Sequence, residues 1–171
     1  MLLSNVYSKI ANFITDIIDN ENFTIIFANQ NAPRPKKPFV TIAISNIRRT
    51  GMPCNLSVDT AGVQTLMLTK LMLVTVECYT DVLHQAEETL ELIENNLSTQ
   101  KAYEYFEQEL SYMFTVMNIM SAPSVVSSTT ENRAIVQFEF LTNQTLLDDL
   151  GFIEHIEITN ENTDEIIIIN K

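Results

Sequence analysis

The side chains that most often perform catalysis or bind metals are scarce in this chain and widely separated. Histidine occurs only at His84 and His155, and cysteine occurs only at Cys54 and Cys78. A zinc site or an activated thiol needs such residues at short, fixed spacings, because one or two elements must aim them at a common point. No such spacing occurs here. The sequence therefore predicts no catalytic residue, no metal ligand and no cofactor, and it predicts buried or half-buried thiols.

The motifs that bind phosphate groups or build a hydrolase nucleophile are also missing, since no GxxxxGK[ST], GxGxxG or GxSxG is present. A run of glutamates, from Glu87 to Glu94, lies opposite the apolar seam of a predicted helix, which is typical of a solvated face. The 22 acidic residues still offer many carboxylate pairs. A small enzyme or a regulatory binding domain with an unrecognised site therefore stays open as an alternative.

Hydrophobic periodicity predicts the elements that would have to position any site. Helices are expected at 4–19, 82–97 and 100–110, and strands at 23–28, 39–47, 63–79, 113–120, 133–142, 152–158 and 166–169. Proline-rich or polar segments are expected to be irregular, among them 31–38, 52–62, 121–132 and 143–149. Asp81 is expected to cap the second helix, with Leu83 in its buried seam. The order of elements predicts a single α+β domain, a mixed or antiparallel sheet with two or three helices packed on one face.

The charge of the chain is strongly acidic but unevenly distributed. The net charge is −12 and the pI is near 4.4, which argues against a general binder of nucleic acid or anionic membranes. Residues 22–58 contain no acidic residue, and their five basic residues are Arg34, Lys36, Lys37, Arg48 and Arg49. Three interpretations stay open: charge balancing within one fold, complementary surfaces on neighbouring subunits, and contact with DNA phosphates.

The C-terminal segment ends in four consecutive isoleucines, Ile166, Ile167, Ile168 and Ile169. An apolar, β-branched chain end needs a sheet edge to join, so it is expected either to complete its own sheet or to add to a neighbour's sheet. We therefore expect a domain at 1–158 and a C-terminal tail at 159–171 that can supply an added strand. The N-terminus has no signal-peptide pattern, and no stretch approaches the roughly 18 apolar residues of a membrane span.

Two segments near the C-terminus resemble a known family. The run RAIVQFEF at 133–140, followed by DLGFIEHIEI at 149–158, is similar to the C-terminal signature of the tail terminator (neck) proteins of long-tailed bacteriophages. The preceding order also fits: an N-terminal helix, a proline-rich loop, a long strand ending near a cysteine, and a glutamate-rich helix. The resemblance in layout covers roughly residues 4–158, and it implies a tail-terminator-like α+β domain.

The resemblance implies a structural virion protein rather than an enzyme. Such a protein forms a ring, usually of six copies, that caps the tail tube, stops its polymerisation and joins the tail to the head connector. The implied location is the tail or neck of the virion, after assembly in the host cytoplasm. The implied partners are further copies, the tail tube protein, head connector or adaptor proteins and also the sheath, with DNA only as passing cargo and with no membrane. A head-completion or connector adaptor, or another tail protein of similar fold, is the alternative.

Within this interpretation, contacts between subunits or with the tail tube are expected at the basic stretch and at the apolar chain end. They are the five basic residues and the four isoleucines: Arg34, Lys36, Lys37, Arg48, Arg49, Ile166, Ile167, Ile168 and Ile169.

Overall fold

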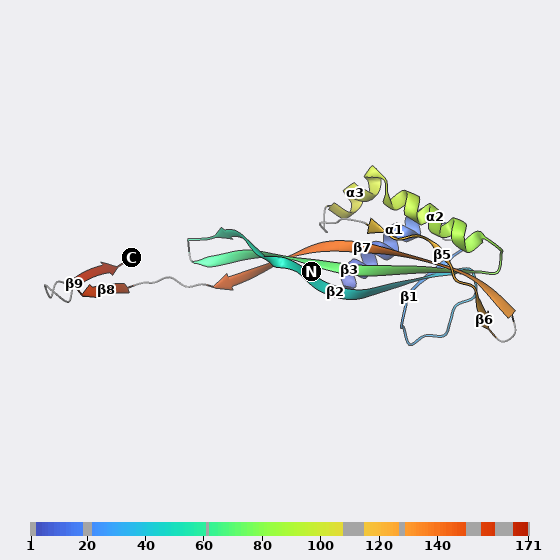
Figure 1. Ribbon diagram of the computed structural model, residues 1–171, viewed down its shortest axis with the longest axis horizontal. Coiled ribbons are helices and arrows are strands. Elements are labelled where there is room, and N and C mark those ends of the chain that lie inside the picture. Colours follow the sequence, from blue (N-terminus) through green and yellow to red (C-terminus); the bar gives the residue numbers. More distant parts are fainter. Residues whose placement is uncertain are drawn as a thin grey trace. The chain divides into compact units, whose positions relative to one another are not determined.

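Three long strands, β2, β3 and β7, organise the fold (Figure 1). The computed structural model describes residues 3–18, 22–60, 62–107, 115–126, 129–149, 155–159 and 166–170. Its elements are α1 (Leu3–Ile17), β1 (Thr24–Phe27), β2 (Phe39–Val58), β3 (Val63–Thr80), α2 (Gln85–Leu97), α3 (Gln100–Glu107), β4 (Thr115–Val116), β5 (Met120–Ser121), β6 (Ser124–Val126), β7 (Thr129–Asp149), β8 (His155–Thr159) and β9 (Ile166–Asn170).

The main sheet is mixed, as the sequence predicts. Its strand order is β1-β2-β3-β7-β4, with β5 and β6 also paired to β7. β1 runs parallel to β2, whereas β4, β5 and β6 run antiparallel to β7. Together with the helices, this sheet forms the α+β domain that the pattern of elements indicates.

The chain divides into two compact units. Unit 1 comprises residues 1–51 and 69–144, and unit 2 comprises residues 52–68 and 145–171. The strands β2, β3 and β7 each contribute residues to both units. All three helices belong to unit 1, which therefore holds the core.

The core of unit 1 lies between one face of the sheet and the helices, as Figure 1 shows for α2 and α3 above the strands. Successive strand residues point to opposite faces, so every second residue is buried from Met72 to Thr80 in β3 and from Ala134 to Thr142 in β7. The buried strand residues are Val40, Ile42, Met72, Val74, Val76, Cys78, Ala134, Val136, Phe138 and Phe140. The helices contribute Val6, Ile10, Phe13, Ile14, Ala86, Leu90, Ile93, Leu97, Ala102 and Phe106. Apolar periodicity in the sequence predicts these inward faces, and it also predicts Ile17 and Leu66 on them, which are only half-buried.

The predicted ends of two strands are wrong. β2 continues through Gly51 to Val58, and β7 runs from Thr129 to Asp149, where a connection and a turn were expected. The alternation of apolar and polar residues stops in these stretches, but backbone pairing does not depend on it. A tight turn joins β2 to β3: the amide of Gly62 (φ +82°) donates to the Asp59 carbonyl, and the Asp59 carboxylate accepts from the Val63 amide.

The start of α2 also differs from the prediction. The helix begins at Gln85 after His84, which has φ +65° and makes no side-chain cap hydrogen bond. Asp81 does not cap the helix, because its carboxylate pairs with Lys37 instead. Leu83 precedes the helix and is 68% exposed, so it does not belong to the buried seam.

Unit 2 contains a separate two-stranded antiparallel sheet formed by β8 and β9. The isoleucine segment is thus paired, as β9, with β8 of the same chain. The predicted strand at 152–158 is described only from His155 onward, and residues 108–110 of the predicted third helix lie outside the described residues. Among the described helices, none is long and apolar enough to cross a membrane.

Candidate assembly surface

The face of the unit 1 sheet opposite the helices carries polar cross-strand contacts between β3 and β7. Arg133 Nη2 donates to Glu77 Oε1 over 2.7 Å, and Gln137 Nε2 donates to Thr75 Oγ1 over 3.1 Å. These residues are the alternate set to the buried core residues, so the strand pleat directs them away from the helices. We refer to this side as the helix-free face.

On this face, a charged cluster connects β7 to the loop between β1 and β2. Glu131 is almost fully buried and accepts from Arg34 Nη2 at 2.7 Å, while Lys37 Nζ lies 3.0 Å from its other oxygen. Lys37 Nζ also lies 3.0 Å from the exposed carboxylate of Asp81. Two cations therefore share one buried anion, which links the proline-rich loop to β7.

An aromatic pair lies beside this cluster. The rings of Phe39 and Tyr79 are stacked with centroids 4.5 Å apart. The guanidinium of Arg34 lies 5.0 Å and 4.9 Å from their two centroids, and that of Arg133 lies 5.5 Å from the Tyr79 ring. Burial, together with the hydrogen bond that the Tyr79 hydroxyl donates to Glu77, raises the pKa of Tyr79 to about 12. The phenol therefore stays neutral at physiological pH. The cluster has a structural role, because it holds the loop between β1 and β2 against the sheet.

The electrostatics of Glu131 have a consequence for stability. Burial by itself would raise the pKa of the carboxyl group, but the hydrogen bonds from Arg34 and Lys37 outweigh it and hold the pKa below the ordinary 4.5. A lowered carboxyl pKa stabilises the fold above the ordinary value, and this stabilisation is lost as the pH falls through the lowered value.

Replacing Glu131 by glutamine should lower the free energy of unfolding at pH 7 by about 2 kcal/mol, since Arg34 and Lys37 lose their shared anion while Arg34 keeps access to water. The difference from the wild type should shrink as the pH falls below 4.5 and through the lowered pKa of Glu131, because the wild-type carboxyl group is protonated first in the unfolded chain and then in the folded one. Thermal unfolding followed by circular dichroism between pH 3 and pH 7 measures both effects. The control is Asp81→Asn, whose exposed ion pair should contribute less than about 1 kcal/mol. A constant difference across this pH range would refute the assigned role of the ionised Glu131.

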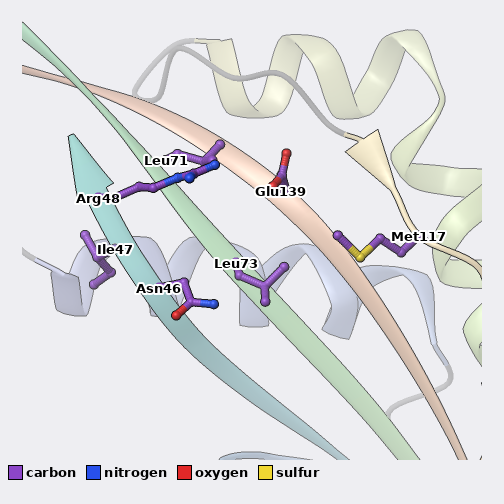
Figure 2. A pocket seen from close by; sticks show the side chains of 7 residues that line it. All are labelled: Asn46, Ile47, Arg48, Leu71, Leu73, Met117 and Glu139. Atoms are coloured by element: carbon purple, nitrogen blue, oxygen red, sulfur yellow. The ribbon is translucent and has the colours of Figure 1, made fainter. Parts of the chain in front are cut away.

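A second part of the helix-free face is an open groove of about 500 Å³ (Figure 2). Its lining residues come from β2, β3, β7 and the segment that follows β4, and they are Asn46, Ile47, Arg48, Leu71, Leu73, Met117 and Glu139. The apolar side chains of Ile47 and Met117 are 46% and 42% exposed. Within the described residues of unit 1, the groove is therefore an exposed and partly apolar surface.

The rims of this groove carry opposite charges. Figure 2 shows Arg48 extending from β2 toward Leu71, while Glu139 lies on β7. Within the described part of the chain, neither Arg48 nor Glu139 has an ion-pair partner. Asn46 has φ +49° inside β2, and this irregularity allows three consecutive residues to line one groove, which a regular strand would not permit.

The structure divides the sequence-predicted interface residues into groups. Arg34 and Lys37 are brought together at Glu131 and are engaged within the chain. Lys36, Arg48 and Arg49 are exposed. As far as the described residues extend, these three have no ion-pair partner, and Arg48 lines the groove. The four isoleucines, Ile166, Ile167, Ile168 and Ile169, belong to β9 in unit 2.

Several residues of this surface were missed by the sequence reasoning. Glu131 was assigned to a connecting segment, although it is a strand residue and the buried anion of the cluster. Leu71 and Leu73 were overlooked as a surface feature. The sequence contains a signal for these two residues: β3 is apolar on both faces around residues 71–74. Such a pattern indicates that the second face is also a contact surface.

The two thiols occupy different environments. Cys78 is fully buried, and this burial raises the pKa of its thiol to about 12, so the thiol is protonated at neutral pH. Cys54 is exposed, which corrects the expectation of a buried or half-buried thiol; alternation stops in its part of β2, so the sequence carried no burial signal there. Within the described ranges, no group of three potential metal ligands is present.

Comparison with known families identifies the chain. A family model described as phage neck terminator protein matches residues 4–165. The chain belongs to the phage neck terminator family. The match includes the charged cluster, the groove and β8 of this neck terminator protein. A comparison with curated proteins gives no match.

Membership of this family confirms the resemblance of the two C-terminal segments to tail terminator proteins. A neck terminator protein is a structural component of the phage tail or neck, and it acts in association with other components there.

Proposed function

We propose that this neck terminator protein assembles as a ring of six copies on the end of the tail tube, stops the polymerisation of the tube and joins the tail to the head connector. The observation that carries the proposal is the family match over residues 4–165. The groove of unit 1 supports it, because exposed apolar surface of this kind is typical of sites that contact other proteins.

The ring would terminate the tube by occupying its end. One surface of the ring binds the last ring of tube protein and leaves no site for a further tube subunit, while another surface receives the connector or adaptor proteins. In contractile phages, the sheath would be an additional neighbour. The net charge of −12 is compatible with DNA crossing the ring without adhering to it.

Within this scheme, residues 1–158 would form the terminator domain, and residues 159–171 would form a tail that contributes β9. The basic residues Lys36, Arg48 and Arg49 would contact neighbouring subunits or the tube, together with the isoleucines of β9. Arg34 and Lys37 would act on the same surface by holding the proline-rich loop in place.

Phage particles produced without this protein test the proposal. We expect electron micrographs to show tail tubes longer than those of the wild type and without attached heads, because elongation continues when no ring caps the tube. Complementation with the wild-type protein should restore the normal length and the heads. Tubes of normal length that lack heads would contradict termination and would instead support a head-completion or connector adaptor.

A further inference from the structure

The two charges of the groove lie on opposite sides of its apolar centre. β3 lies between β2 and β7 in the sheet, and it contributes Leu71 and Leu73 to the lining of the groove. Arg48 of β2 lies on one side of these leucines and Glu139 of β7 lies on the other, as Figure 2 shows. All four residues belong to unit 1. Across the strands, the groove therefore carries a positive, an apolar and a negative position in turn.

Neither charge is neutralised by the described residues. Arg48 and Glu139 take part in no ion pair there. By contrast, Arg34, Lys37 and Arg133 of the same unit each pair with a carboxylate. The surface that would complement the groove has an apolar centre and the same two charges in the reverse order.

A second copy of the groove meets this requirement. In a two-fold contact, residue i of one copy faces residue j of the other, and residue j of the first copy faces residue i of the second. An axis parallel to β3 places β2 of each copy over β7 of the other and leaves β3 over β3. Each Arg48 then faces Glu139 of the other copy, and the leucines of both copies meet between the two ion pairs. Sheets that pack face to face interdigitate side chains in this way, about 10 Å apart.

We propose that the groove binds the groove of a second copy of this chain, so that the free protein pairs face to face through two reciprocal ion pairs between Arg48 and Glu139. This contact goes beyond the proposed ring, because a ring of identical subunits is built from head-to-tail contacts between two different surfaces. The pairing also covers Ile47 and Met117, whose side chains are exposed in the groove.

Reversing one charge of the groove at a time tests the pairing. Full-length Arg48→Glu and full-length Glu139→Arg should each weaken the dimer by at least about 10-fold, because like charges then oppose each other at both ends of the contact. An equimolar mixture of the two variants should form dimers again, since the two substituted side chains then face each other and so do the two unchanged ones. Analytical ultracentrifugation across a concentration series measures each dissociation constant, and circular dichroism verifies each fold.

Lys36→Glu is the matched control. Lys36 is exposed, does not line the groove and has no ion-pair partner in the described part of the chain. Like Arg48→Glu, this substitution takes the net charge from −12 to −14, so it reproduces the general repulsion between two copies without changing the groove. The dissociation constant of its dimer should stay close to the wild-type value, and an equal weakening in this control would overturn the assigned role of Arg48.

The remaining outcomes separate this inference from the proposed function. A wild-type protein that is monomeric at every concentration, a dimer that survives both single reversals, or a mixture that stays monomeric would overturn the groove contact and leave the ring on the tube end standing. Assemblies of six copies in place of dimers, in the wild type or in the restored mixture, would overturn the two-fold geometry while supporting the ring. Tails of normal length in particles that lack this protein would contradict termination and leave the pairing intact.

Discussion

Replacing Phe106 by alanine is expected to lower the free energy of unfolding by about 3–5 kcal/mol, the cost of removing a large aromatic side chain from a packed core. Phe106 is 1% exposed and lies where three elements meet. Its ring centroid is 4.9 Å from that of Phe13 in α1 and 5.7 Å from that of Phe140 in β7. The substitution therefore removes the contact that anchors α3 to both the first helix and the sheet.

Urea unfolding followed by far-ultraviolet circular dichroism measures this loss. The control is Tyr103→Ala in the same helix, because Tyr103 is 44% exposed and should change the free energy of unfolding by about 1 kcal/mol or less. Equal losses in the two variants would show that α3 is not anchored through Phe106.

Reversing the charges of Arg48 and Arg49 to glutamate is expected to abolish assembly while the monomer stays folded. Both side chains are exposed, and they have no ion-pair partner in the described part of the chain, so the described fold loses no internal ion pair. The change takes the net charge from −12 to −16 and places like charges against an acidic neighbour. We expect association to weaken by at least about 100-fold, or roughly 3 kcal/mol.

Light scattering across a concentration series measures this effect, and circular dichroism verifies the fold. The charge-preserving double variant, with lysine at both positions, is the matched control and should assemble. Salt supplies a second readout: wild-type association should weaken as ionic strength rises, because exposed charges are screened. Normal rings in the glutamate variant would show that these arginines do not contribute to subunit contacts.

Most elements of unit 1 could be predicted from hydrophobic periodicity. The inward residues of α1, β3 and β7 follow the 3.6-residue and two-residue repeats, and the structure buries them as expected. The lengths of β2 and β7 could not be predicted in this way. Their exposed ends are held by backbone pairing with neighbouring strands, which leaves no pattern in the side chains.

The candidate surface was only partly predictable. The concentration of basic residues in 22–58 is visible in the sequence, but their roles are not. Arg34 and Arg48 belong to the same basic stretch of the sequence, but the structure pairs the first with Glu131, 97 positions away, and places the second at the rim of a groove. Long-range pairing of this kind depends on which strands become neighbours, and local sequence does not specify that.

The sequence by itself determined the acidic charge of this protein, its α+β fold and its family. These follow from composition, periodicity and a strand signature, which are local properties of the chain. Only the tertiary structure decided which charges are neutralised inside the subunit, where a groove lies on the sheet of unit 1, and which strand pairs with the isoleucine segment. The physical reason is that these features arise from strand order and register, which bring together residues far apart in the sequence and are set by the packing of the whole domain.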